Sequence, residues 1–426
     1  MAYSFSDIRV KAEFDLENIY KLFSKSSVNE HGMLELECSL KKGTGLADTI
    51  RKINNTGIKL FLNDDKKILF NGIIKRAVSF NKQGEDILKL YAVGLTKELD
   101  KDKKKRLFQG DKLNNKDIAE HIVSEYSGKF LAENENNNSV YIALQYEESD
   151  WEFIKRIATR EGKLIIQAES AEGLRIYFGI PDTEAKTNYD KEILISGTDN
   201  TSCITEEDID KGYIISGKWH IFLSEENYGL GSLVNIKNEK YIVIEKEAEF
   251  INGFLQFKYK VCKKDKIKVL EKYNSKITGI LLDGTVKKCE ADDIFVKFDI
   301  ESNISTEQVR LNWFPIIGNV MYCMPEEDTK VKVYFGDFDE RKNVFAVESI
   351  NNAVNSERGL ITKAFKSMQL RNKGVSFKSK SSVETSGKNI DFSSSEKLLI
   401  LSDKDIKVKA ELMTLISRTD IEFVKK

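Results

Sequence analysis

The sequence predicts a mainly β fold with an α/β insertion, followed by a repetitive β-structured spike at the C-terminal end. Three observations predict it. Short runs with alternating apolar residues fill most of the chain, and two helical patterns interrupt them between residues 101 and 215. After Gly359, paired apolar residues recur about every eight positions. Only three prolines occur in 426 residues, so long uninterrupted strands are possible.

Composition argues against several classes of partner. The 67 basic and 68 acidic residues give a net charge of -1, so there is no global electrostatic reason to expect nucleic acid or an anionic membrane. No apolar run is long enough to span a bilayer, and the N-terminal segment lacks the apolar stretch of a signal peptide. We therefore expect synthesis and assembly in the cytoplasm, with any export following a route other than a cleaved signal.

Cysteine and histidine give no sign of a metal site or a disulfide framework. The five cysteines are far apart, odd in number and form no CxxC motif, which suits a reducing compartment. The three histidines show no metal-binding spacing. We expect no metal and no cofactor. The residues concerned are Cys38, Cys203, Cys262, Cys289, Cys323, His31, His121 and His220.

The first part of the chain, residues 1–100, is β-rich. Two strand patterns, Ile58–Leu62 and Lys67–Ala77, flank an Asn-Asp-Asp sequence and predict a hairpin. A further strand is expected over Ile87–Gly94. A short helix is expected over Gly45–Asn54, where apolar residues share one face.

Residues 101–215 show a mixed α/β pattern. The basic run KDKKKR at 101–106 is most simply a solvated loop, in preference to an anion site. Asn115 is the expected cap of a first helix that extends to Gly128. Ser149 and Glu152 have the spacing of a capping box and predict the start of a second helix. Gly162 is its expected stop, and two strands should follow, Leu164–Gln167 and Leu174–Phe178.

Strand patterns return after residue 215. Residues 216–275 contain further alternating runs, and residues 277–350 contain about five short strands. Alternation is regular in Ile294, Val296, Phe298 and Ile300, and again in Val331, Val333 and Phe335. Five strands in so short a segment suit a small closed barrel of the OB type.

The C-terminal segment, 360–426, contains apolar pairs at i and i+2, which place both members on one face of a strand. One short strand and a turn per unit is the pattern of a β-helix or β-prism. The pairs are Val375/Phe377, Val383/Thr385, Ile390/Phe392, Leu398/Ile400, Ile406/Val408, Met413/Leu415 and Ile421/Phe423.

A single ribbon of this kind cannot bury its apolar stripe. Each large apolar side chain left in water forfeits roughly 1.5–3 kcal/mol, or about 20 kcal/mol over the repeat. Several identical ribbons wound about one axis would bury the pairs in a shared core and place Lys, Ser and Asp outside. A disordered polar tail is the alternative, but disorder does not explain seven pairs in phase.

No catalytic constellation is found. The chain has no GxSxG, Walker A or GxGxxG motif. Carboxylate pairs such as Glu147/Glu148 are expected by chance among 68 acidic residues. Trp151 is assigned to the core, and the Trp313-Phe314 pair to loop packing in preference to a partner contact. We therefore predict no catalytic residues and no enzyme activity.

Two motifs and the repeat together resemble the VgrG family and the related hub-and-spike proteins of contractile phage tails. The first motif, EESDWEFIKRIATREGKLI at 147–165, resembles the family's ESD helix followed by EG and a strand. Its matching residues are Glu148, Ser149, Asp150, Phe153, Arg156, Glu161 and Gly162.

The second motif, at 324–350, resembles the end of the family's OB module. Asp328 stands where the family usually has glycine, and Arg341-Lys342 stands where proline often follows. The C-terminal repeat resembles the family's needle. The matching residues of the second motif are Pro325, Val331, Val333, Phe335, Gly336, Asp337 and Asp339.

The resemblance implies a homotrimeric hub and spike. It assigns residues 1–100 to a first hub β-barrel, 101–215 to a mixed α/β hub domain, and 216–275 to the strands of a second hub barrel. It assigns residues 277–350 to an OB-fold module and residues 360–426 to a triple-stranded β-helical needle. The implied needle core is Val375, Phe377, Ile390, Phe392, Leu398, Ile400, Ile406, Val408, Met413, Leu415, Ile421 and Phe423.

The function implied is structural. The trimer would cap a hexameric inner tube of Hcp-like protein, contact baseplate proteins, and carry a separate tip protein and effectors into a target envelope. The apparatus would be a phage tail, a phage-tail-like bacteriocin or a type VI-like secretion system. Two alternatives stay open: a trimeric envelope-degrading tail-spike enzyme, and a surface adhesin with a β-helical stalk.

Overall fold

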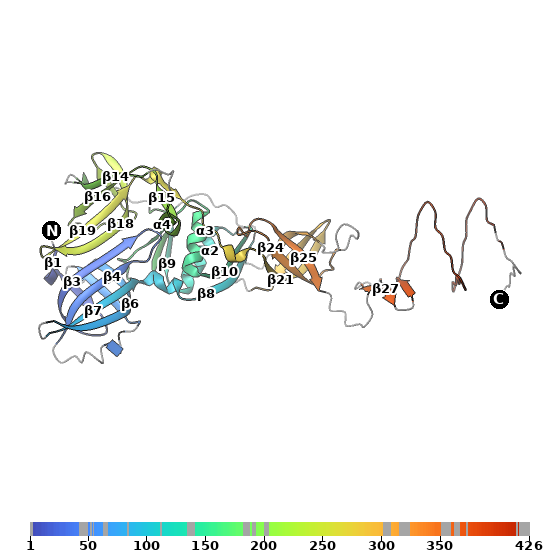
Figure 1. Cartoon of the computed structure of the whole chain (residues 1–426), viewed down its shortest axis with the longest axis horizontal. Coiled ribbons are helices and arrows are strands. Elements are labelled where there is room, and N and C mark those ends of the chain that lie inside the picture. Colours follow the sequence, from blue (N-terminus) through green and yellow to red (C-terminus); the bar gives the residue numbers. More distant parts are fainter. Residues whose placement is uncertain are drawn as a thin grey trace. The chain divides into compact units, whose positions relative to one another are not determined.

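The protein is described from a computed structural model of the whole chain (Figure 1). It divides into two compact units, Met1–Asn352 and Ala353–Lys426. The structure describes residues 3–41, 50–51, 53, 55–62, 67–82, 85–110, 113–133, 141–181, 188–189, 193–199, 204–300, 308–314, 324–350, 359–361, 367–371, 374–414 and 416.

The first unit is mainly β and is built on one large sheet. Ten strands follow the order β14-β16-β19-β18-β3-β4-β7-β6-β5-β2, and three more pair beside this path. The strands are β1 (Tyr3–Ser4), β2 (Ile8–Lys11), β3 (Leu16–Ser27), β4 (Met33–Leu40), β5 (Gly57–Leu62), β6 (Lys67–Lys82), β7 (Glu85–Gly94), β13 (Asn188–Tyr189), β14 (Ile193–Thr198), β16 (Lys218–Ser224), β17 (Leu233–Ile236), β18 (Glu239–Ile251) and β19 (Phe254–Cys262).

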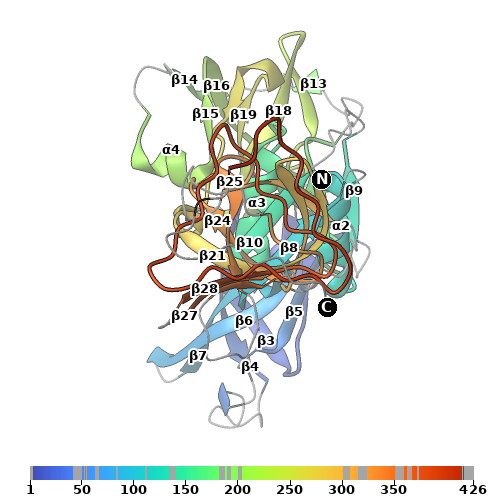
Figure 2. The ribbon, with the colours of Figure 1, turned by 90° about the vertical axis from the view of Figure 1, so that its right-hand side faces the viewer.

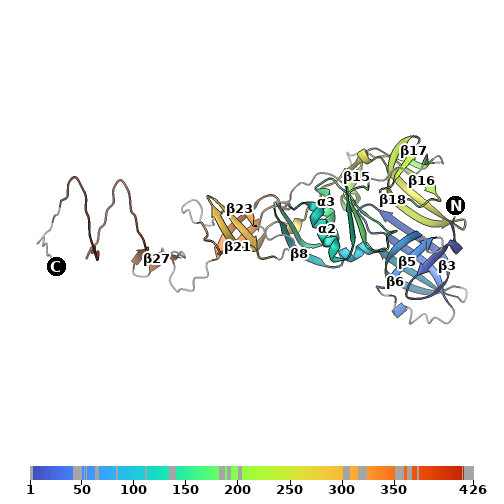
Figure 3. The ribbon, with the colours of Figure 1, turned by 180° about the vertical axis from the view of Figure 1, so that it is seen from behind.

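This sheet joins the N-terminal strands to β13, β14 and the strands that follow residue 215. The two sets meet where β18 pairs antiparallel with β3, with Glu245 opposite Ser27 and Glu249 opposite Phe23. One apolar core lies along both sets and includes the fully buried Leu36, Phe70 and Phe257. The ranges 1–100 and 216–275 therefore contribute to the same sheet and share one core (Figure 3).

Local predictions for the N-terminal part are confirmed where they can be compared. Strands β5 and β6 form the predicted hairpin, with Leu60 opposite Phe70. Strand β7 covers the predicted Ile87–Gly94. Most of the helix predicted over Gly45–Asn54 lies outside the described residues, and residues 50–51 are helical.

Between the two strand sets lies the predicted α/β insertion. It contains helices α2 and α3, which pack on each other around buried residues such as Ile122, Phe153 and Ile157. The elements are η2 (Leu95–Asp100), β8 (Lys103–Gln109), α2 (Asn115–Glu125), β9 (Lys129–Ala132), β10 (Ile142–Ser149), α3 (Asp150–Thr159), β11 (Ile165–Gln167), β12 (Arg175–Phe178), α4 (Glu206–Lys211) and β15 (Tyr213–Ile215).

Two predictions in this region need correction. The basic run at 101–106 is not simply a loop, because residues 103–106 begin strand β8, which pairs antiparallel with β10. The cap of α2 is Asn114, one residue before the predicted Asn115, and its side chain accepts a hydrogen bond from Asp117 N at 2.8 Å. Asn115 is already helical and buried.

Residues 280–350 form a small closed barrel in the order β21-β22-β23-β25-β24. Alternate residues point inward, so Ile294 and Val296 are fully buried, as are Val331, Val333 and Phe335. Phe314, after β23, is half-exposed and its ring lies 4.9 Å from that of Phe345. The strands are β21 (Ile280–Glu290), β22 (Asp293–Phe298), β23 (Val309–Trp313), β24 (Lys330–Phe335) and β25 (Val344–Ile350), preceded by η3 (Lys264–Lys266), β20 (Ile267–Val269) and η4 (Ser275–Ile277).

The second unit begins with a three-stranded antiparallel sheet, β26 (Gly359–Ile361), β27 (Ser367–Arg371) and β28 (Gly374–Lys378) (Figure 2). In the single chain, the described residues beyond β28 form no helix or strand. Their large apolar side chains are exposed, from 43% for Ile390 to 89% for Ile416. A strand requires a hydrogen-bonding partner, and a lone ribbon supplies none.

Candidate functional site

The site begins at the N-terminus of helix α3, where the predicted capping box is confirmed. Ser149 Oγ accepts a hydrogen bond from Glu152 N at 3.1 Å, and Glu152 Oε2 accepts one from Ser149 N at 2.8 Å. Ser149 Oγ also donates to Asp100 Oδ1 at 2.5 Å. The cap therefore starts the helix and also attaches it to η2.

Specific hydrogen bonds also fix the C-terminal end of α3. Gly162 has a φ of +64°, the left-handed conformation that glycine adopts without a steric penalty. Gly162 N donates to Thr159 O and Lys163 N to Ala158 O, both at 3.0 Å, which is the Schellman pattern. The predicted stop at Gly162 is confirmed, and Glu161 beside it pairs with Lys163 at 3.0 Å.

Arg156 lies in the middle of α3, only 2% exposed, with every guanidinium donor used. Nε and Nη2 donate to the Glu148 carboxylate at 2.6–3.2 Å, and Nη2 also donates to Leu144 O at 2.7 Å. Nη1 donates to both carboxylate oxygens of Glu340 at 2.9 Å. Arg156 therefore connects its own helix to strand β10 and to the loop 336–343 of the closed barrel.

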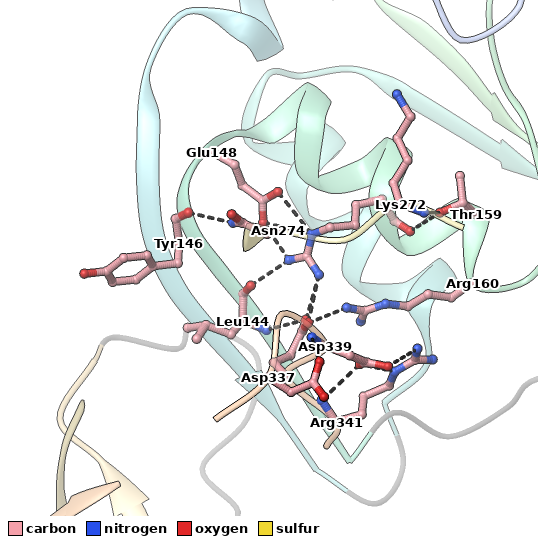
Figure 4. A network of polar contacts seen from close by, with 12 residues as sticks. Leu144, Tyr146, Glu148, Thr159, Arg160, Lys272, Asn274, Asp337, Asp339 and Arg341 are labelled. Carbon is pink, nitrogen blue, oxygen red and sulfur yellow. Dashed lines mark hydrogen bonds and ion pairs between the residues drawn. The ribbon is translucent and has the colours of Figure 1, made fainter. Parts of the chain in front are cut away.

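Glu340 is fully buried and receives a second cation from the same helix. Arg160 Nη2 lies 2.6 Å from Glu340 Oε2, and Leu144 N donates to Oε1 at 3.1 Å. Burial by itself raises the pKa of Glu340, but Arg156 and Arg160 outweigh it and lower the pKa. Glu148 shows the opposite balance: burial raises its pKa against the attraction of Arg156. We call Arg156, Arg160, Glu148 and Glu340 the buried ion cluster; it lies in the network of Figure 4.

The loop that carries Glu340 is held by a second set of bonds (Figure 4). Arg341 donates to both oxygens of the buried Asp339 at 2.7 Å, and to Glu271 Oε1 at 2.6 Å. Burial opposes ionisation of Asp339, but these bonds prevail and lower its pKa to about 2. Asp337 Oδ1 accepts from Asp339 N at 3.1 Å. The Asp-x-Asp sequence thus shapes the turn that presents Glu340 to the helix.

The closed barrel supplies the base of this loop. Val331, Val333 and Phe335 anchor β24 in the barrel interior, and Gly336 begins the turn with its N donating to Asn343 O at 2.9 Å. Pro325 is buried, and its carbonyl accepts from Cys289 Sγ at 3.1 Å. Asp328, which replaces the usual glycine, has a φ of +62°, a conformation that aspartate tolerates better than most residues.

A further buried carboxylate, Asp150, holds the other side of the helix start. It accepts from Lys104 Nζ at 2.7 Å, from Tyr126 Oη at 2.7 Å and from Gln145 Nε2 at 2.9 Å, and it also pairs with Arg106. Lys104 and Arg106 belong to the basic run that was predicted to be solvated. Alternate residues of β8 point the same way, so these two cations reach the carboxylate together.

The structure brings the two predicted motifs together. Ser149 and Asp150 lie at the start of α3, Phe153 and Arg156 lie further along it, and Asp337 and Asp339 shape the loop whose Glu340 bonds to Arg156. Sequence reasoning missed Glu340 and Arg160. A partial signal for Arg160 existed, because residues at i and i+4 lie on the same helix face and Arg160 is four residues after Arg156. Glu340 follows Asp339 directly in the second motif.

The predicted needle residues lie in the other unit, and those whose side chains the structure describes are exposed in the single chain. Phe377, Leu398, Ile400, Ile406 and Val408 are all more than half exposed. Leu415, Ile421 and Phe423 lie outside the described residues, as does the side chain of Val375. Their role in a needle core stays a prediction.

The contacts of the site join helix α3, strand β10 and the loop of the closed barrel. Within the described ranges, no group of three or more His, Cys, Asp or Glu residues could hold a metal ion. No helix among the described residues is long and apolar enough to cross a membrane. The buried ion cluster has its charges paired and closed off from water, which suits a rigid joint between α3 and the barrel.

Comparison with solved structures identifies the fold. The chain is similar to a type VI secretion system component of E. coli, c3393, itself described as similar to the T4 bacteriophage tail proteins gp27 and gp5. The TM-score is 0.56 at 10% identity, over 81% of this chain and 99% of that one. Two structures of the Francisella PdpA-VgrG complex are also similar. The lidded form gives a TM-score of 0.53 over 88% of this chain and 80% of that one, and the lidless form 0.51 over 87% and 97%, both at 11% identity.

No family model and no curated protein sequence matches the chain. The chain therefore has the fold of VgrG-like and phage-tail hub proteins, and the resemblance stated from its motifs is confirmed at the level of fold.

Proposed function

We propose that this protein is the structural hub and spike of a contractile injection apparatus and that it works as a homotrimer. The first unit would form the hub, and the second unit would form a triple-stranded β-helical needle. A needle of this kind would pierce a target envelope when an outer sheath contracts. The similarity in fold to c3393 and to VgrG, over more than four-fifths of the chain, supports this proposal.

The proposal of a trimer rests on one observation: the C-terminal apolar pairs are exposed in the single chain. Phe392, Ile400 and Val408 are 66–71% exposed in the single chain, in phase with the other pairs of the repeat. A soluble chain that left this stripe in water would present a long aggregation-prone edge. Three copies wound together would bury the stripe and pair every strand.

The hub is the proposed contact with the inner tube. Its sheet contains two sets of strands, one from each side of the α/β insertion, so three chains would present six similar units. Six units would match a hexameric tube of Hcp-like protein. Baseplate proteins would surround this ring, and a separate tip protein and effectors would be carried on the needle.

The closed barrel is proposed to act as an OB-type collar between hub and needle. The buried ion cluster joins its loop 336–343 to helix α3 through Arg156 and Glu340. Such a joint would carry load because a short, bidentate, fully buried contact has little freedom to yield. We propose assembly in the cytoplasm and delivery outward as part of the particle.

Light scattering on two lengths of the chain tests the proposal. The intact chain should be a trimer, three times 48.7 kDa, and a version that ends near Asn351 should lose the contribution of the needle to trimer stability. A monodisperse, well-behaved monomer for the intact chain would rule out the proposed spike. A peptidoglycan cleavage assay on the trimer separates the enzyme alternative, because turnover abolished by one carboxylate substitution would contradict a purely structural role.

A further inference from the structure

A small cavity lies in the first unit, away from the buried ion cluster. Its volume is about 140 Å³, space for about four or five water molecules at about 30 Å³ each. Apolar walls come from Ile166, Tyr177, Pro181 and Leu230, and the polar lining includes Ser170, Ser232, Gln167, Glu169 and Lys246. The cavity therefore combines an apolar wall with two side chains of opposite charge.

Lys246, on strand β18, is the cationic side of the cavity. It is only 5% exposed, and its Nζ lies 5.4 Å from the centre of the Phe257 ring. Within the described part of the chain, Lys246 has no hydrogen-bond acceptor and no carboxylate within 4.0 Å. The ammonium lines the cavity and no acceptor among the described residues is bonded to it, so it can receive an anion or a water molecule there.

Glu169, which follows β11, is the anionic side. Its Oε1 accepts from Gln167 Nε2 at 3.0 Å, and Gln167 Oε1 accepts from Thr96 Oγ1 at 2.7 Å. A Cβ atom at Gly32 would collide with the Glu169 carboxylate, so glycine at that position is what lets the carboxylate lie there. The carboxylate is thus positioned by its neighbours and still has acceptor capacity directed to the cavity.

Electrostatics agree with this geometry. Burial lowers the pKa of Lys246, and burial raises the pKa of Glu169 to about 7. Each group feels the charge of the other, yet they do not form a direct ion pair. A ligand with an anionic and a cationic end would satisfy both groups at once.

We propose that this cavity binds a compact zwitterion, a free α-amino acid no larger than alanine. Its carboxylate accepts from Lys246 Nζ, and its ammonium donates to the Glu169 carboxylate. The apolar wall closes over the α-carbon. This binding site is lined by residues of the first unit alone and does not depend on the proposed function.

Isothermal titration calorimetry on the full-length chain tests the site with glycine as the probe. The native chain should bind one glycine per chain. Lys246→Met and Glu169→Gln should each weaken binding by about tenfold or more, because each removes one charged partner. Lys258→Met is the matched control: Lys258 lies on the neighbouring strand β19 and pairs with Glu247 at 3.0 Å outside the cavity lining. It should leave glycine binding unchanged.

Three related probes make the result specific. Acetate and methylammonium, which each carry one of the two charges, should bind at least about tenfold more weakly than glycine. Leucine should bind more weakly than glycine, because a cavity of about 140 Å³ favours a small side chain. The proposal fails if glycine does not bind, if acetate alone binds as tightly as glycine, or if the two cavity variants bind glycine as the native chain does.

Discussion

Arg156 shows how one residue can connect three elements. Its five donors are divided between Glu148, Leu144 O and Glu340, and Arg160 adds a second positive charge beside Glu340. The cluster holds two cations and two anions, so its charges cancel within a few ångströms. Removing any one member leaves an uncompensated buried charge, which costs far more than the intact pair contributes.

The first prediction concerns Glu340→Ala. It should lower the free energy of unfolding by about 3–5 kcal/mol, because both arginines lose a buried partner. Urea denaturation of the variant and the native chain measures this. Glu271→Ala is the matched control: it removes a half-exposed partner of Arg341 and should cost no more than about 1 kcal/mol. Equal losses for the two variants would show that the cluster is not the joint described here.

Two other buried groups have opposite effects on the pH dependence of stability. Burial lowers the pKa of His31 from 6.5 to about 4, with Lys97 acting in the same direction. The unfolded chain therefore takes up this proton first, and stability falls as the pH drops from about 6.5 to about 4. Burial raises the pKa of Glu169 from 4.5 to about 7, so the folded chain takes up that proton first, and stability rises as the pH drops from about 7 to 4.5.

The second prediction is that Glu169→Gln exposes the His31 effect. The free energy of unfolding of the variant should fall more steeply between pH 6.5 and 4.5 than that of the native chain. His31→Asn should change the slope in the opposite direction. Urea denaturation at a series of pH values measures both, and a common slope for all three proteins would contradict the assignment. The groups that face the two residues are Lys97, Asp100, Lys155, Lys246, Gln167 and Thr96.

At the scale of single residues, the sequence predicts side-chain hydrogen bonds between residues close in the chain, but not those between distant residues. Ser149 and Glu152 are three residues apart, and their bonding follows from spacing alone. Arg156 and Glu340 are 184 residues apart, so no local pattern pairs them. The same holds for Lys104 and Arg106, whose partner Asp150 is more than 40 residues away.

At the scale of elements, helix α3 gives a direct comparison between a buried and an exposed cap. Ser149 is 3% exposed and bonds to Asp100 as well as to the helix. Thr205 caps the short helix α4 with the same capping-box geometry, but in solvent. Both caps satisfy a helix N–H group; only the first also ties the helix to another element.

The third prediction follows from this difference. Ser149→Ala should cost about 1–2 kcal/mol of stability, at the upper end for a cap, because a bond to η2 is lost as well. Thr205→Ala should cost about 0.5 kcal/mol, at the lower end. Thermal and urea unfolding of the two variants give the comparison. A larger loss for Thr205→Ala would contradict the role given to Ser149.

Most elements of the first unit could be predicted, because alternation in strands such as β22 and β24 and the capping signal of α3 are local. The basic run at 101–106 could not, since a strand of Lys and Arg has no apolar alternation. It forms because Leu107 and Phe108 are buried and because Asp150 neutralises two of its cations. The joining of distant strands into one sheet through β3 and β18 also has no local signal.

At the scale of the whole molecule, the two units differ in how far a single chain buries its apolar side chains. The first unit buries its own cores, and its barrel closes by pairing β24 with β21. The second unit has a regular apolar repeat, and the repeat side chains that the structure describes are exposed in the single chain. We therefore propose that the repeat requires other copies of the chain, because a core shared by several chains would bury the apolar pairs and leave the polar residues outside.

The last prediction tests that assembly through one unit of the repeat. Ile406 and Val408 share a face, and each is more than half exposed in the single chain. Replacing both with Asp would place six carboxylates at the axis of a trimer and would forfeit about 9–18 kcal/mol, at roughly 1.5–3 kcal/mol for each of six side chains. The trimer should then lose its resistance to heat and detergent, measured by the temperature at which it dissociates on a denaturing gel. Lys407→Asp is the matched control, because Lys407 would point to the opposite face of the strand proposed for the trimer, and its replacement should leave that temperature nearly unchanged. If the double variant dissociates at the same temperature as the control, the pair does not lie in a shared core.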